Sequence, residues 1–276
     1  MRLPSLFARR GFLLGAALVG AVVVAAACAH WLAPFDPVRN NYRYRLGEPN
    51  GIFLLGTDRY GRDVLSRILF GARVSLGIGF SVAVVSGLAG GLAGLAAGWW
   101  RRADPWIMRV MDGLMAFPGV LLAIALAATL GPSEGTVVVA LTVAYAPRTA
   151  RVMRGAVLVA RAQDYVEAAH AIGARTLRIL ARHILPACTA PLVVQQTYVF
   201  AVAILAEAVL SFVGVGPPPP APTLGSIIAD GRDAMVEAPW VMLCPGVAIA
   251  MLVLGLNLLG DGLRDALDPR MRRMVR

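Results

Sequence analysis

The chain has 276 residues, 58% of them hydrophobic, and a formal net charge of +10. Soluble domains contain about 45–50% apolar residues, and the excess here lies in long runs, which excludes an ordinary soluble domain. Lipid offers the backbone no hydrogen-bond partners, so such runs must be helical. They also lack the alternation of polar and apolar residues that barrel strands show. The composition therefore predicts an all-α polytopic membrane protein.

The basic side chains are all arginine, because the chain contains no lysine. A P-loop needs a lysine to reach the nucleotide phosphates, so we place any ATP chemistry on a partner. A nucleic-acid partner would require a soluble basic face, whereas cytoplasmic loops of membrane proteins are ordinarily rich in arginine. We therefore expect no nucleic acid. The cysteines and histidines are too scattered to favour a disulfide or a metal site. They are Cys28, Cys188, Cys244, His30, His170 and His183.

Six apolar runs are close to the roughly 20 residues that a bilayer-spanning helix requires. In chain order the predicted spans are 11–33, 72–98, 108–130, 135–150, 187–214 and 241–260. Arg9 and Arg10 before the first run resemble the start of a signal peptide, but the run is long, and we predict an uncleaved helix. Pro147 is expected to end or kink the fourth span. We divide the chain into 1–70, an N-terminal transmembrane helix with an outer loop, and 71–276, the transmembrane domain.

The arginines are distributed unevenly between the two sides of these spans. Most fall at the N-terminus, between the second and third spans, in the segment 148–186 and in the C-terminal tail. The positive-inside rule therefore predicts that both termini are cytoplasmic. The exception is the stretch 39–73, whose arginines are balanced by nearby acids. These acids are Asp36, Glu48, Asp58 and Asp63.

The segment 148–186 is polar enough to lie outside the membrane and is patterned for two short helices. Asp164 can cap the first helix, and Gly173 offers a C-cap or a turn before the second. The stretch 167–169, Glu-Ala-Ala, would give a smooth face that enters a groove and a charge for its rim. From residue types alone, a docking element and a plain solvated loop are equally good interpretations.

The same segment resembles a known family pattern. Glu167-Ala168-Ala169, followed after three residues by Gly173 and after nine more by His183-Ile184-Leu185-Pro186, is similar to the EAA loop of ABC importer permeases. That family often has isoleucine at the position of His183, and the His-Ile-Leu-Pro ending resembles the peptide-importer branch. Other resembling segments are 55–67, 204–212 and 257–270. The resemblance covers nearly the whole chain from residue 50 onward.

This resemblance implies the type I ABC importer permease fold, the second permease of a pair, and transport by alternating access. The implied partners are a sister permease, two ABC ATPase subunits and an extracytoplasmic binding protein, in the bacterial inner membrane. ATP and magnesium would bind the ATPase subunits, and this chain would be no enzyme and bind no cofactor. The implied cargo is a dipeptide or oligopeptide, with nickel or glutathione as alternatives. The implied ATPase-coupling residues are Asp164, Glu167, Ala168, Ala169, Gly173 and Ala174.

Glu207 is the one acid that we predict inside a span, and intramembrane acids commonly face a cavity or a partner. It can line the translocation pathway or hold a helix-packing contact. Gln195 and Gln196 are further pathway candidates. A secondary transporter would show an internal repeat and paired ionisable residues at mid-membrane, and the sequence shows neither feature.

Charged residues also gather on the predicted outer side. They can contact the partner permease or the binding protein, or they can form a local salt-bridge network. These residues are Asp58, Arg59, Arg62 and Asp63. The run Pro217 to Pro220 is expected to be stiff and extended. The segment 225–240 then predicts a short interfacial helix with four charges for a binding protein. The four are Asp230, Arg232, Asp233 and Glu237.

Overall fold

The computed structural model describes residues 10–267, which form helices joined by loops. Within these residues the only strand-like pairing is an isolated bridge between Thr57 and Asp63. The prediction of an all-α protein is confirmed. Arg9 and the last part of the C-terminal resembling segment, residues 268–270, lie outside the described residues.

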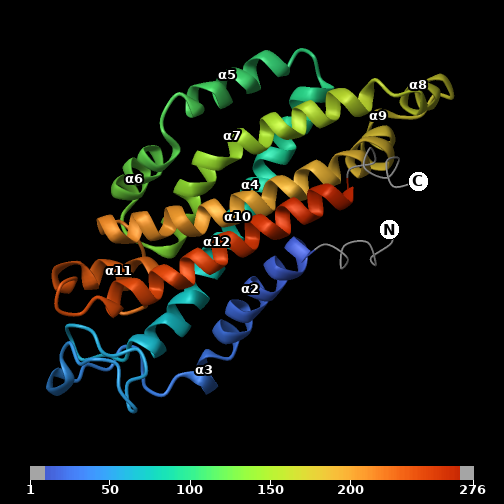
Figure 1. Cartoon of the computed structure of the whole chain (residues 1–276). Coiled ribbons are helices and arrows are strands. Elements are labelled where there is room, and N and C mark those ends of the chain that lie inside the picture. The colour runs from blue at the N-terminus through green and yellow to red at the C-terminus, as the bar shows by residue number, and fades with distance from the viewer. Residues whose placement is uncertain (1–9, 268–276) are drawn as a thin grey trace.

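The long helices run alongside one another, as Figure 1 shows for α4, α7, α10 and α12. The helix bounds are α2 (Arg10–Ala27), α3 (Ala29–Leu32), α4 (Val64–Trp99), α5 (Asp104–Met115), α6 (Gly119–Leu130), α7 (Glu134–Arg161), α8 (Asp164–Ala171), α9 (Thr176–Ile179), α10 (Leu185–Val213), α11 (Leu224–Gly231) and α12 (Trp240–Leu267). A π-helical turn, Leu180–Ile184, joins α9 to α10. Short 3-10 turns are Tyr42–Tyr44 and Arg232–Ala234.

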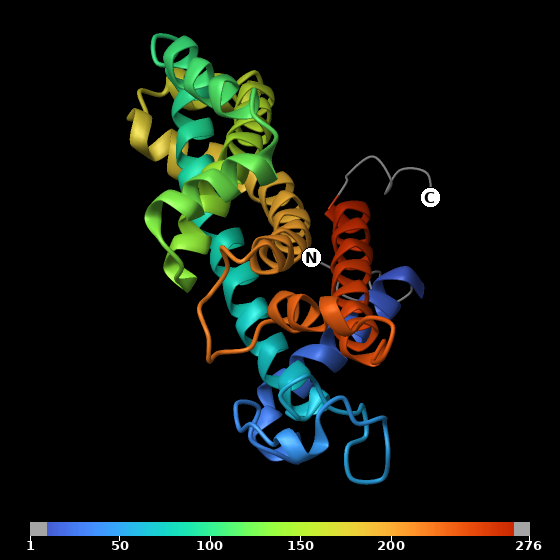
Figure 2. The same ribbon diagram turned by 90° about the vertical axis from the view of Figure 1, so that its left-hand side faces the viewer.

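The two ends of the molecule differ. Helices α8 and α9 lie at one end, together with the start of α2 and the end of α12, while α11 and the loop after α3 lie at the other (Figure 1). Figure 2 shows α12 and α2 standing to one side of α4, α7 and α10. α2 and α12 approach closely where Gly15 and Gly255 face each other, because neither residue has a side chain to hold the backbones apart.

Four helical segments among the described residues are long and apolar enough to cross a membrane, namely α2, α4, the continuous stretch Thr176–Val213 and α12. α5 and α6 together make a fifth, but they are bent by 87°. The predicted third span, 108–130, is therefore a broken pair, because Pro118 cannot donate the hydrogen bond that would continue α5. The predicted fourth span lies in the first part of α7, which has 28 residues but is not among these apolar helices, so the described residues give four or five candidate spans where the sequence predicted six.

Two boundaries differ from the sequence-based prediction. α7 passes through Pro147 and ends only at Arg161, so the expected loop from 148 is helical as far as 161. Packing against α4 offsets the hydrogen bond that a proline removes from a helix. The division after residue 70 falls inside α4, which begins at Val64 because Asp63 caps it. The carboxylate of Asp63 accepts hydrogen bonds from the Ser66 backbone N–H (2.8 Å) and hydroxyl (2.6 Å).

Glycines on one face of α4 bring α7 close enough for this packing. A Cβ atom added at Gly94 would lie 2.7 Å from the Cβ atom of Met153, and one added at Gly98 would lie 2.7 Å from the Cβ atom of Val157. Atoms do not approach that closely in proteins, so only glycine allows this separation of the two helices.

We expect Gly94→Ala to lower the stability of the protein, because overpacking a tight contact costs about 1–3 kcal/mol. Gly77→Ala is the matched control on the same helix. Nothing lies within 4 Å of a Cβ atom added at Gly77, and alanine is the better helix former by about 1 kcal/mol. Thermal unfolding of both variants in one detergent measures the difference. Equal melting temperatures would show that the glycine face does not set the distance between α4 and α7.

Candidate functional site

The α8–α9 tip, residues 164–179, protrudes at one end of the molecule (Figure 1). α8 is closed by a left-handed turn in which Gly173 has a φ of +74°. The N–H of Gly173 donates to the carbonyl of His170 (2.9 Å), and the N–H of Ala174 donates to the carbonyl of Ala169 (3.1 Å). These two bonds form a Schellman motif. The predicted turn at Gly173 is confirmed.

Asp164 does not cap α8 as the sequence suggested. Gln163 occupies the cap position, and its side chain makes no capping hydrogen bond. Asp164 and Glu167 instead lie in the first turn, where both are exposed and their charges interact favourably with the helix dipole.

The two faces of α8 have different surroundings. Val166 and Ala169 are buried in a cluster with residues of α7, α9 and α10, because positions three apart share a helix face. Ala174 packs against the same cluster. Ala168 is exposed on the other side. The expectation that Ala168 and Ala169 together form a docking face is therefore wrong for Ala169, which supports the tip from behind.

Large apolar side chains are exposed on the tip. Ile172 is 85% exposed and Leu177 is 76% exposed. The sequence carries no signal for either residue, because two isolated apolar residues in a polar segment have no periodicity. Large apolar side chains exposed to this degree are typical of a surface that meets another protein.

Asp58 is the centre of the outer charged cluster and has no exposed surface. Its carboxylate accepts hydrogen bonds from the side chains of Arg62 (2.7 Å) and Arg67 (2.5 Å). It also accepts from the backbone N–H groups of Tyr60 (2.8 Å) and Arg62 (3.0 Å). Both arginines reach Asp230 as well, Arg62 at 2.8 Å and Arg67 at 2.9 Å. The cluster thus ties the outer loop and α4 to α11, as the salt-bridge interpretation expects.

Arg59 is the member of the predicted cluster that stays at the surface. It forms an ion pair with Asp233 at 2.7 Å, with the two side chains 32% and 55% exposed. The hydrogen bond from Arg59 holds the pKa of Asp233 below its ordinary value. Exposed pairs contribute little to stability, so both side chains are free to exchange this contact for one with a partner protein.

Glu207 lies within α10 and has no exposed surface. Its carboxylate accepts hydrogen bonds from the hydroxyls of Ser75 (2.8 Å) and Ser211 (2.6 Å). The Ser75 hydroxyl in turn accepts from the backbone N–H of Leu224 (3.2 Å). Glu207 therefore joins α4, α10 and α11, which fits a packing contact better than a place on the pathway.

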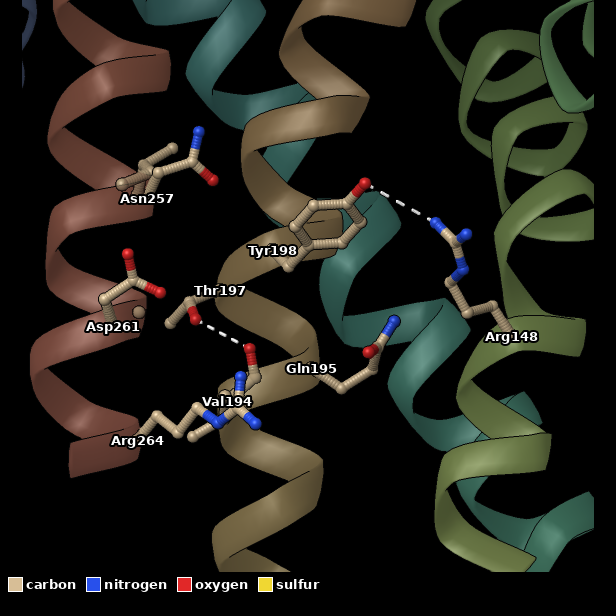
Figure 3. Close-up of a pocket in the computed structure, with 10 residues that line it drawn as sticks. Arg148, Val194, Gln195, Thr197, Tyr198, Asn257, Asp261 and Arg264 are labelled. Atoms are coloured by element: carbon tan, nitrogen blue, oxygen red, sulfur yellow. Dashed lines mark hydrogen bonds between the residues drawn. The ribbon is translucent and has the colours of Figure 1, made fainter. Parts of the chain in front are cut away.

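The two glutamines of α10 face different surroundings. Gln196 packs between helices, where its amide donates to Thr149 (3.1 Å) and accepts from the hydroxyl of Ser86 (3.3 Å). Gln195 borders a cavity of about 370 Å³ between α7, α10 and α12, which Figure 3 shows. The polar residues that line this cavity are Arg148, Gln195, Thr197, Tyr198, Asn257, Asp261 and Arg264.

A comparison with known protein families identifies the family to which this chain belongs. Residues 87–273 match the family model described as binding-protein-dependent transport system inner membrane component. The chain belongs to this family. The residues that match this inner membrane component begin within α4 and continue through α12, so they include the α8–α9 tip.

Relatives of this inner membrane component match nearly the full chain. A protein of Brucella suis biovar 1, described by its name as a peptide transport system permease, is 54% identical over 97% of this chain and 90% of its own. The di/tripeptide transport system permease protein DppC of Pseudomonas aeruginosa is 44% identical over 95% and 89%. The glutathione transport system permease protein GsiD of Pectobacterium atrosepticum is 43% identical over 96% and 89%.

The fold is also found among solved structures. A chain of the MetNI methionine ABC transporter has a TM-score of 0.58 and 23% sequence identity, and it covers 73% of this chain and 96% of its own length. The likeness shows that the helices share one architecture, the ABC importer permease fold that the sequence analysis expected.

Proposed function

We propose that this chain is a permease subunit of an ATP-binding-cassette importer that moves peptides across the bacterial inner membrane. The proposal is carried by near full-length similarity to relatives whose names specify peptide, di/tripeptide or dipeptide transport, at 54%, 44% and 40% identity. The membrane-spanning helices and the family match support the same reading. Transport would proceed by alternating access, in which partners bind the inward and outward states with different affinity.

The α8–α9 tip is our candidate for the contact with an ATPase subunit. It presents the exposed apolar side chains of Ile172 and Leu177, and the carboxylates of Asp164 and Glu167 are exposed on the first turn of α8. An apolar centre within a polar rim is the usual anatomy of a protein interface. In this proposal Ala168 also touches the ATPase. Ala169, Gly173 and Ala174 act indirectly, because they hold the tip in shape.

The ends of the chain support a cytoplasmic position for this tip. The start of α2 and the end of α12 lie at the same end of the molecule as α8 and α9 (Figure 1). Arg175 and Arg178 belong to the tip itself, as the positive-inside rule requires of a cytoplasmic side. The Asp58 cluster and α11 then face outward, toward an extracytoplasmic binding protein.

The family match also supports the remaining partners in this proposal. We propose a sister permease that completes the pathway and two ATPase subunits that bind ATP and magnesium. In this scheme the chain itself binds no cofactor and is a transport subunit rather than an enzyme.

Affinity purification of the tagged chain from membranes tests the proposed function. We expect an ATPase, a second permease and a binding protein to co-purify, and we expect the reconstituted complex to take up peptides only with ATP. A chain recovered alone that drives uptake from a proton gradient would contradict the proposal.

We expect Ile172→Ser combined with Leu177→Ser to lower ATP-dependent uptake by more than about tenfold, since burying each side chain at an interface is worth about 1.5–3 kcal/mol. The ATPase should also be recovered in smaller amounts. Val236→Ser is the control for recovery of the ATPase, because Val236 is 96% exposed but lies beyond α11, at the opposite end from the tip. Equal recovery of the ATPase with both variants would show that the tip is not the ATPase contact.

Glutathione is the second candidate cargo, because a relative named for glutathione transport is 43% identical. Titration of the co-purified binding protein with dipeptides and with glutathione separates the two. Tighter binding of glutathione would move the assignment from peptides in general to this one modified tripeptide.

A further inference from the structure

α12 carries a polar stripe although it is apolar enough to span a membrane. Asn257, Asp261 and Arg264 are spaced by four and three residues, so they share one face of the helix. All three side chains are exposed. Charged groups are costly in lipid and face a cavity or a partner instead. In this chain the face borders the cavity between α7, α10 and α12 (Figure 3).

Arg148 lies on the opposite wall of the cavity, on α7 (Figure 3). Its guanidinium carbon is 5.7 Å from the centroid of the Tyr198 ring, and it donates a long hydrogen bond of 3.5 Å to the Tyr198 hydroxyl. These contacts orient the guanidinium but leave most of its five donors unused. Among residues 10–267, neither Arg148 nor Asp261 forms an ion pair.

Gln195 adds an amide between the two charged walls. Its Nε2 atom is buried and has no hydrogen-bond partner among the described residues. A buried donor without a partner costs free energy, so rotation of the Gln195 amide toward the cavity, which the residue already borders, would let a bound acceptor satisfy it.

We propose that this cavity binds short zwitterionic peptides on the cytoplasmic side of the translocation pathway. The peptide carboxylate lies against Arg148, the ammonium group lies against Asp261, and the peptide amide bonds with Gln195. This assignment rests on the proposed function of peptide import. The volume of about 370 Å³ is near the lower end of the roughly 300–1,000 Å³ of ligand sites. It therefore suits a peptide of two or three residues.

Blocked peptides test each charge separately. The probe is radiolabelled alanyl-alanine, bound at equilibrium to the purified transporter complex without ATP and without the binding protein. The N-acetyl form and the C-terminal amide are the competitors. We expect the wild-type complex to prefer the free dipeptide over either blocked form by about tenfold or more, as a charge-assisted hydrogen bond provides.

The variants then remove one preference each. Asp261→Asn should lose the preference over the N-acetyl form only. Arg148→Gln should lose the preference over the amide only, and Arg148→Lys should keep part of it. Arg101→Gln is the matched control, because Arg101 is exposed beyond the end of α4 and does not line the cavity.

Three results would overturn the site. In the first, the wild-type complex imports peptides but binds none in this assay. In the second, Asp261→Asn and Arg148→Gln both keep the two preferences. In the third, the sister permease no longer co-purifies with these variants, which would assign the polar face to subunit assembly. Each of these results contradicts the binding site but not the proposed function of peptide import. Failure of the wild-type complex to import peptides would contradict the proposed function itself.

Discussion

Gly173→Val is expected to uncouple ATP hydrolysis from peptide uptake while the protein still inserts and assembles. Gly173 has a φ of +74°, a conformation in which a β-branched residue is a true outlier. An L-residue there costs about 1–2 kcal/mol. Nothing lies within 4 Å of an added Cβ atom, so the effect comes from the backbone and not from a clash. The variant should leave the left-handed turn and displace Ile172 and Leu177 from their places on the tip.

Uptake and ATP hydrolysis by the reconstituted complex measure this separation. Uptake should fall by about tenfold for each 1.4 kcal/mol by which the correct tip geometry is disfavoured, while hydrolysis continues. Gly173→Asn is the matched control, because asparagine tolerates the left-handed conformation at helix ends, and it should keep most of the uptake. Normal uptake by the valine variant would mean that the turn at Gly173 does not carry the coupling.

Local features of this chain could be predicted from the sequence because their causes are local. Long apolar runs predict helices, since lipid leaves the backbone no other partner. A glycine after a short helix predicts the turn at Gly173. Pro147 shows where such reasoning fails. Its local preference is to end a helix, but the contact of α7 with the glycine face of α4 keeps the helix intact to Arg161.

The candidate site residues also divide into features that the sequence predicts locally and features that depend on contacts between helices. The sequence singled out Asp58 as a charged residue, but its partnership with Arg67 and Asp230 depends on how α4 and α11 meet. Glu207 was recognised as an intramembrane acid, but its hydrogen bond with Ser75 depends on how close another helix comes. The cavity around Gln195 could not be predicted, because its walls come from three helices that are distant in sequence.

The largest loss of stability is expected from Asp58→Ala. Breaking a buried ion pair by removing one partner costs about 3–5 kcal/mol, because the other charge stays buried. The side chain of Arg67 is 3% exposed and that of Arg62 is 14% exposed, so neither can turn to water without moving. Asp230 remains 2.9 Å from Arg67, which places the expected loss in the lower half of that range.

Thermal unfolding in detergent measures the loss, and two further variants identify its cause. Asp233→Ala is the control, since this exposed carboxylate pairs only with arginines at the surface, and its melting temperature should stay at the wild-type value. The double variant Asp58→Asn, Arg67→Met removes the buried charge together with its partner and should recover much of the stability. If the double variant unfolds as early as Asp58→Ala, the loss comes from the hydrogen bonds that Asp58 accepts from the backbone of its own loop. The charges would then hold the loop in shape, and α11 would be joined to α4 by the buried apolar contacts of Ile227 and Val64.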